Sequence, residues 1–163
     1  MTNLEKYRSV LKNEAAGLFL TSRYSRMYAA QFDIAEGYAV IGKNGAYYFT
    51  DGRYIESAQN NIHGFRVVEI GANKSLSSAV NEVLAAEGIT ELGYEENYLT
   101  VAELKQFEEV LNAEFVPMQN AINPFRYSKD AWELERMEKA QEITDKAFTE
   151  VCTRIREGMT EKE

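Results

Sequence analysis

The chain has 163 residues, of which 45% are hydrophobic and 12% aromatic, and its formal net charge at pH 7 is −8. These values fit one compact globular domain that folds without disulfides, and they argue against a disordered chain. The negative charge repels phosphates and anionic lipids, and lysines and arginines are scattered singly, so we expect neither nucleic acid nor a membrane as a partner.

The first residues alternate charged with apolar side chains and lack the apolar run of a signal peptide. Apolar residues at helical spacing predict a helix over residues 2–13, and a short buried strand follows at 18–20. Strands at 38–41 and 46–49 flank Asn44-Gly45, a pair that tolerates the positive φ of tight hairpin turns. These two strands should therefore be antiparallel neighbours.

The segment between the first two strands contains Arg23-Tyr24-Ser25-Arg26-Met27-Tyr28. Basic and aromatic residues together can mark a nucleic-acid surface. Given the net charge, a loop or short helix that packs its tyrosines is the better interpretation.

The next elements alternate between helices and strands. Asp51 is placed to cap a helix that contains Tyr54 and ends near Gly64. Strands are predicted at 65–70, 91–94 and 114–117, separated by a helix that ends at Gly88 and by a helix that a Thr100-x-x-Glu103 capping box opens. We expect an α/β fold with a mixed, roughly six-stranded sheet, in which a meander of three strands is extended by right-handed helical crossovers.

A long helical pattern runs from residue 128 to about 156. Cys152 is the only cysteine, and its place in this pattern favours a small buried residue over a nucleophile. The Thr160-x-x-Glu163 capping box would begin another element. We therefore expect two parts, a domain over 1–127 and a linker helix over 128–163 that leads into a further domain.

Groups that could perform catalysis or bind a metal are scarce. His63 is the only histidine and has no cysteine nearby, so a common zinc site cannot be built, and a loop position between a helix and a strand is expected. The sequence has no EF-hand, phosphate-binding loop, dinucleotide fingerprint or nucleophile elbow. We expect no catalytic residue and no metal ligand in this chain.

One polar segment differs from the rest of the sequence. Thr50-Asp51-Gly52-Arg53-Tyr54 places an acid, a guanidinium and a phenol within one turn, directly after a buried strand. An arginine there can form a charge-assisted fork with a carboxylate, within the fold or across an interface. A structural role is the simpler interpretation, because such clusters are seldom catalytic.

The segments Phe32–Tyr38 and Thr50–Ala58 resemble the amino-terminal domain of the creatinase, prolidase and aminopeptidase P family. Further similar segments follow in the family's order: Leu20-Thr21-Ser22, Leu92–Glu95 with Leu99-Thr100, Arg126 with Lys129–Ala147, and Gly158–Glu161. Two departures affect the loop after the first strand: Met27 stands where that family often has Arg, and Gln31 where it often has Gly. The resemblance implies a ribonuclease H-like fold that ends in a long linker helix.

The resemblance also implies a function, that of the non-catalytic N-terminal domain of a cytoplasmic Xaa-Pro metallopeptidase, either a dipeptidase or an aminopeptidase P. The family's catalytic domain binds two divalent metal ions, such as manganese, through two Asp, one His and two Glu, all of which would lie beyond Glu163. The present domain would help to form a homodimer and to wall the active site, which admits short proline-containing peptides. The candidates near the substrate are Phe32, Asp51, Arg53 and Tyr54.

Two alternatives fit the same residues. The chain could be a stand-alone binding or interaction module of this fold, or the N-terminal half of a creatinase-like amidinohydrolase. Under each interpretation we expect the chain alone to be catalytically inactive.

Overall fold

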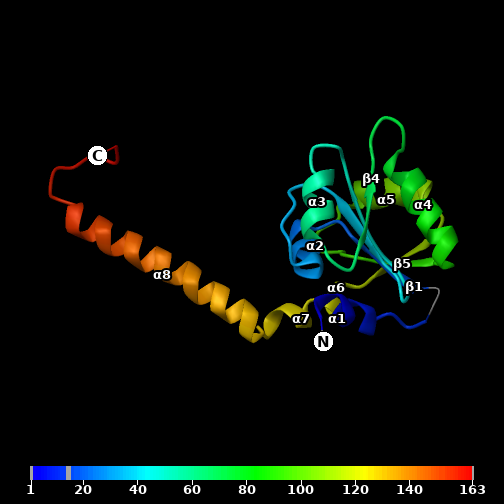
Figure 1. Ribbon diagram of the computed structural model, residues 1–163, viewed down its shortest axis with the longest axis horizontal. Coiled ribbons are helices and arrows are strands. Elements are labelled where there is room, and N and C mark those ends of the chain that lie inside the picture. The colour runs from blue at the N-terminus through cyan, green and yellow to red at the C-terminus, as the bar shows by residue number, and fades with distance from the viewer. Residues whose placement is uncertain (1, 14–15, 163) are drawn as a thin grey trace. The chain divides into compact units, whose positions relative to one another are not determined.

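The computed structural model describes residues 2–13 and 16–162 (Figure 1). Contacts divide the chain into two compact units, here called unit 1 and unit 2, at the bond between Phe125 and Arg126. The functional boundary that the sequence suggests, after residue 127, stays a prediction.

The described part of unit 1 forms a six-stranded mixed sheet with the strand order β4-β3-β2-β1-β5-β6. Strand β2 is antiparallel to β1 and β3, whereas the pairs β3–β4, β1–β5 and β5–β6 are parallel. The predicted mixed α/β sheet, its meander and the later addition of parallel strands are confirmed, whereas the right hand of the crossovers stays a prediction. The strands are β1 (Ala16–Leu20), β2 (Tyr38–Ile41), β3 (Ala46–Thr50), β4 (Arg66–Glu69), β5 (Glu91–Tyr94) and β6 (Glu114–Pro117).

Alternation along the central strands divides the buried side chains of unit 1 into two cores, because successive residues of a strand face opposite sides of a sheet. The first core contains Leu18 and Leu20 and packs against α1 (Asn3–Ser9), α2 (Arg23–Ala30) and α3 (Ile55–Asn61). The second core contains Phe19 and packs against α4 (Leu76–Glu87) and α5 (Val101–Val110). Helices therefore cover both faces of the sheet (Figure 1).

Side-chain caps fix where several helices begin. Ser22, Ser75 and Thr100 accept backbone N–H groups at the starts of α2, α4 and α5, and Thr100 with Glu103 forms the predicted capping box. Gly88 ends α4 with a φ of +69°, a conformation that glycine adopts without steric cost. The segment that contains Tyr24 and Tyr28 is helix α2, where Tyr28 is buried but Tyr24 is exposed.

Unit 2 contains most of the long helical pattern as α8 (Ala131–Arg154). The helix begins later than residue 128 because Asp130 and Glu133 form a capping box. Two short helices that the sequence does not predict precede it, α6 (Gln119–Ile122) and α7 (Pro124–Tyr127). The expectation that Cys152 is buried is wrong, because α8 has no buried residue among those described.

His63 lies between α3 and β4, as predicted, and is exposed. The helix start expected at Thr160-x-x-Glu163 includes Glu163, which lies outside the described residues. A search of the described residues finds no helix whose length and hydropathy suit a membrane span.

Candidate functional site

The polar segment after β3 is organised by Asp51 and Arg53. The Asp51 carboxylate accepts the backbone N–H of Arg53 at 2.9 Å and the Nε of the same residue at 3.0 Å. The prediction that Asp51 caps the next helix is wrong, because Tyr54 occupies the N-cap position of α3 and makes no side-chain cap bond. The short carboxylate side chain instead bonds to the backbone two residues ahead, as aspartate often does in turns.

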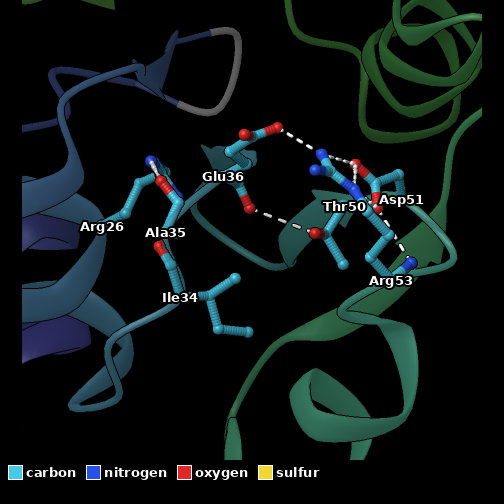
Figure 2. Close-up of polar contacts among 7 residues, drawn as sticks. All are labelled: Arg26, Ile34, Ala35, Glu36, Thr50, Asp51 and Arg53. Carbon is cyan, nitrogen blue, oxygen red and sulfur yellow. Dashed lines mark hydrogen bonds and ion pairs between the residues drawn. The ribbon is translucent and has the colours of Figure 1, made fainter.

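Arg53 also reaches a second acid, Glu36, which precedes β2. Its Nη2 donates to the carboxylates of both Asp51 and Glu36, and Figure 2 shows the guanidinium lying between the two acids. Hydrogen bonding to Arg53 lowers the pKa of Asp51, and the same two acids raise the pKa of Arg53. Arg53 and Glu36 are exposed and Asp51 is partly exposed, so the ion pairs shape the surface more than they stabilise the fold.

Arg26, on α2, lies beneath the segment that leads to Glu36. The residue is only 4% exposed, and its Nη1 and Nη2 donate to the backbone carbonyls of Ile34 at 3.3 Å and Ala35 at 3.4 Å. Its Nη1 also donates to the Tyr48 hydroxyl at 2.6 Å. Burial raises the pKa of Tyr48, so the phenol is neutral near pH 7 and is not a counter-ion for the arginine.

Thr50, the last residue of β3, completes the arrangement from the other side. Its hydroxyl donates to the carbonyl of Glu36 at 3.1 Å (Figure 2). Three consecutive carbonyls, those of residues 34, 35 and 36, are therefore held by side chains from α2 and β3.

A pocket of about 360 Å³ adjoins these groups. Its lining includes residues that end or follow strands β1, β3, β4 and β5, namely Thr21, Thr50, Asp51, Ile70, Tyr98 and Leu99. Because these strands are parallel to one another, their carboxyl ends meet at one edge of the sheet, where open α/β sheets commonly bind ligands. The site is therefore a polar rim beside a modest pocket.

The structure brings three of the four predicted site residues together. Asp51 and Arg53 are bonded, and the Arg53 guanidinium lies 5.1 Å from the centroid of the Tyr54 ring. Phe32 and Tyr54 are partly buried and pack against the first core. Asp51 lines the pocket, whereas Phe32, Arg53 and Tyr54 are not among its lining residues. Their roles near a substrate stay predictions.

The sequence did not mark Glu36 and Arg26 as parts of this site, and it gave Thr50 no role within the polar segment that contains it. Arg26 gives one usable signal, since it precedes Ala29 and Ala30 by three and four residues and so shares their buried helix face. The loop carbonyls that accept from Arg26 gave no signal, because a sequence pattern does not show which backbone carbonyls a side chain will contact. Across residues 2–13 and 16–162, the structure holds no group of three or more His, Cys, Asp or Glu that could bind a metal ion.

Comparison with known proteins identifies the fold and the family. The model of the Creatinase/Prolidase N-terminal domain matches residues 4–128. The chain belongs to this family. The resemblance seen in the sequence is thereby confirmed, and the site of this creatinase/prolidase N-terminal domain lies where β2 begins and β3 ends.

The proteins that this creatinase/prolidase N-terminal domain resembles include peptidases, and they match the chain as a whole. It is 31% identical over 160 residues to an uncharacterized peptidase, YqhT, of Bacillus subtilis, covering 97% of this chain and 45% of that protein. It is 30% identical to a putative Xaa-Pro aminopeptidase of Mycoplasma genitalium, and the alignment covers 99% of this chain and 45% of that protein. The solved structure of the Xaa-Pro dipeptidase from Bacillus anthracis matches with a TM-score of 0.87 and 30% identity. The match covers 98% of this chain and 44% of that chain. The chain thus spans less than half the length of these relatives.

Replacing Arg53 by glutamine is expected to raise the pKa of Asp51 toward the ordinary value of about 3.9, because the main cause of its lowering is removed. A lowered folded-state pKa means that the pair's stabilisation is present above the unfolded-state pKa and is lost as pH falls through the folded-state pKa. The change can be followed by NMR titration of the Asp51 carboxyl carbon.

Arg23→Gln is the matched control for this titration. Arg23 pairs with Asp33 and lowers the pKa of that acid in the same way. The control should raise the pKa of Asp33 and leave Asp51 unchanged. An Asp51 titration that does not move in Arg53→Gln would show that the ion pair is not formed in solution.

Proposed function

We propose that this chain is the non-catalytic N-terminal domain of a Xaa-Pro metallopeptidase, a dipeptidase or an aminopeptidase P. The observation that carries the proposal is the family match over residues 4–128, together with relatives that are aligned to nearly all of this chain but over only 45% of their own length. Xaa-Pro peptidase is the activity that the Bacillus anthracis and Mycoplasma genitalium relatives carry in their names.

In this proposal the hydrolytic chemistry belongs to a catalytic domain beyond residue 163. That domain would supply the ligands for two divalent metal ions, such as manganese, and the substrates would be short proline-containing peptides. The parent protein would work in the cytoplasm, where an exposed thiol such as that of Cys152 stays reduced.

The contribution of the present chain would be assembly and shape. We propose that it takes part in a homodimer and walls an active site with the rim around Asp51, Arg53, Tyr54 and Phe32. Two features support this role: the rim is held in place by several side chains, and α8 carries exposed apolar residues suited to packing. These residues are Trp132, Leu134, Met137, Ile143, Phe148 and Val151.

A peptidase assay of the 163-residue chain and of the complete parent protein tests the proposal. With manganese and a Xaa-Pro dipeptide, the parent is expected to turn over substrate and the chain alone to show none above background. Metal-dependent turnover by the chain alone would refute its non-catalytic role. A parent that hydrolyses creatine but no Xaa-Pro peptide would favour the creatinase-like alternative.

Two further measurements address the remaining proposals. Sedimentation of the parent protein at a mass of two subunits would support the homodimer, whereas a monomer at micromolar concentration would contradict it. A reading frame that ends directly after Glu163 would favour the stand-alone interaction module.

A further inference from the structure

The segment from Gln31 to Gly37, here called loop 31–37, connects α2 to β2 without forming a helix or strand. It starts abruptly, because Gln31 ends α2 in the left-handed region with a φ of 53°. Loops without internal hydrogen bonding usually exchange among conformations. This loop instead has three successive carbonyls bonded to Arg26 and Thr50, which belong to the rigid elements on either side.

Outward-facing pairs reinforce these inner contacts. Arg23 forms a two-bond fork with Asp33, and Arg53 binds Glu36. The loop is thus held on its inner side by Arg26 and Thr50 and on its outer side by two ion pairs. Because exposed ion pairs contribute little, the buried contacts decide the conformation.

Burying Arg26 is costly, which argues that the arginine has a specific task. A guanidinium that leaves water must recover its lost hydration from its partners. Within the described part of the chain, the acceptors of Arg26 are the Tyr48 phenol and the carbonyls of Thr21, Ile34 and Ala35, all of them neutral. A leucine or methionine would fill such a position at lower cost but would leave both loop carbonyls without donors.

We propose that Arg26 is a positioning residue that fixes loop 31–37 in one conformation, so that the exposed side chains of Asp33 and Glu36 meet the rest of the parent protein in a preformed arrangement. The purpose of this arrangement rests on the proposed wall function, but the rigidity itself does not. A preformed loop avoids the entropy cost of ordering when it meets a partner or substrate.

NMR relaxation of the ¹⁵N-labelled chain tests the rigidity. Backbone order parameters at Ala35, Glu36 and Gly37 are expected near 0.85, the value of rigid backbone, and should fall below about 0.6 in Arg26→Met. Arg8→Met is the matched control, because Arg8 donates to the carbonyls of Gly42 and Asn44 in a different turn. It should leave loop 31–37 unchanged. Order parameters below 0.6 in the unmodified chain, or unchanged in folded Arg26→Met, would overturn the proposal.

A second variant decides the matter if Arg26→Met fails to fold. Thr50→Val keeps the shape of the side chain and removes only the donor to the Glu36 carbonyl. Order parameters at Glu36 and Gly37 should then fall relative to those of Ala39 and Val40 in β2. Unchanged values at Glu36 and Gly37 in Thr50→Val would contradict the proposal.

Kinetics of the complete parent protein test the purpose of the loop. Arg26→Met is expected to raise KM for a Xaa-Pro dipeptide roughly tenfold with kcat within about twofold, because the loop would shape binding without touching the reacting atoms. Arg26→Lys, which keeps the charge but not the fork, should recover part of the loss. An unchanged KM would refute this purpose, whereas an unmodified parent without turnover would refute the proposed function and leave the NMR result standing.

Discussion

Replacing Phe19 by alanine is expected to lower the free energy of unfolding of unit 1 by about 3–5 kcal/mol, as for other large-to-small changes in well-packed cores. Phe19 is fully buried in the second core. Its ring stacks on Tyr38 at a centroid distance of 5.8 Å and meets Phe107 and Phe115 edge-on at 5.0 and 6.4 Å. Alanine would remove all three ring contacts at once, in the middle of the sheet.

Urea unfolding followed by circular dichroism measures this loss, and two variants calibrate it. Phe148→Ala, at a position on α8 that is 70% exposed, should change the midpoint of unit 1 little. Phe19→Leu should cost less than Phe19→Ala because it retains most of the apolar volume, and it gives a measurable transition if the alanine variant does not fold. A loss below about 1 kcal/mol in Phe19→Ala would contradict the described packing.

The strands could be predicted from local patterns: β1, β2 and β3 are short, mostly apolar runs, and β4, β5 and β6 are short segments with apolar centres between helical patterns. Phe19 lies between Leu18 and Leu20, and the strand is buried on both faces, as a continuous apolar run indicates. The Asn44-Gly45 pair likewise placed the hairpin between β2 and β3, where Val40 pairs with Tyr47. Local sequence suffices where the signal and the contact lie within a few residues of each other.

Contacts between distant segments, in contrast, could not be predicted. Arg26 bonds to Tyr48, 22 residues away, and hydrophobic patterning gives no reason to bury an arginine. Asp51 is an exception at short range: whether its carboxylate caps the next helix or accepts from Arg53, two residues ahead, depends on how the turn closes. Cys152 looked buried because a helical pattern identifies an apolar face without showing what covers it.

Glu95 is a further buried group that periodicity does not identify. It follows β5 directly, is 1% exposed, and accepts the backbone N–H groups of Thr21 and Ser22, each at 3.0 Å, and the hydroxyl of Ser25. These three donors lie 70 to 74 residues earlier in the sequence, between the end of β1 and the first turn of α2. The Glu95 carboxylate therefore joins the end of β5 to the start of the helix that carries Arg26.

Replacing Glu95 by alanine is expected to lower the free energy of unfolding by about 3–4 kcal/mol, because three donors, two of them buried and one partly buried, lose their acceptor. Glu95→Gln should cost less, about 1–2 kcal/mol, since its amide oxygen can still accept the two backbone N–H groups and the Ser25 hydroxyl can turn to accept from the amide nitrogen. Urea unfolding measures both variants, and Glu108→Gln on the exposed face of α5 is the control with the same chemical change.

The order of these three variants tests how the start of α2 is held. A loss that is equally large in Glu95→Gln and Glu95→Ala would show that the negative charge, which is favourable beside a helix N-terminus, matters more than the acceptor geometry. If Glu95→Ala lowers the free energy of unfolding no more than Glu108→Gln does, the three hydrogen bonds to Glu95 do not form in solution. In the expected order, Glu95→Ala is the least stable variant, Glu95→Gln loses less, and Glu108→Gln is unchanged. That order would mean that one buried acceptor, Glu95, fixes the start of the helix from which Arg26 holds loop 31–37.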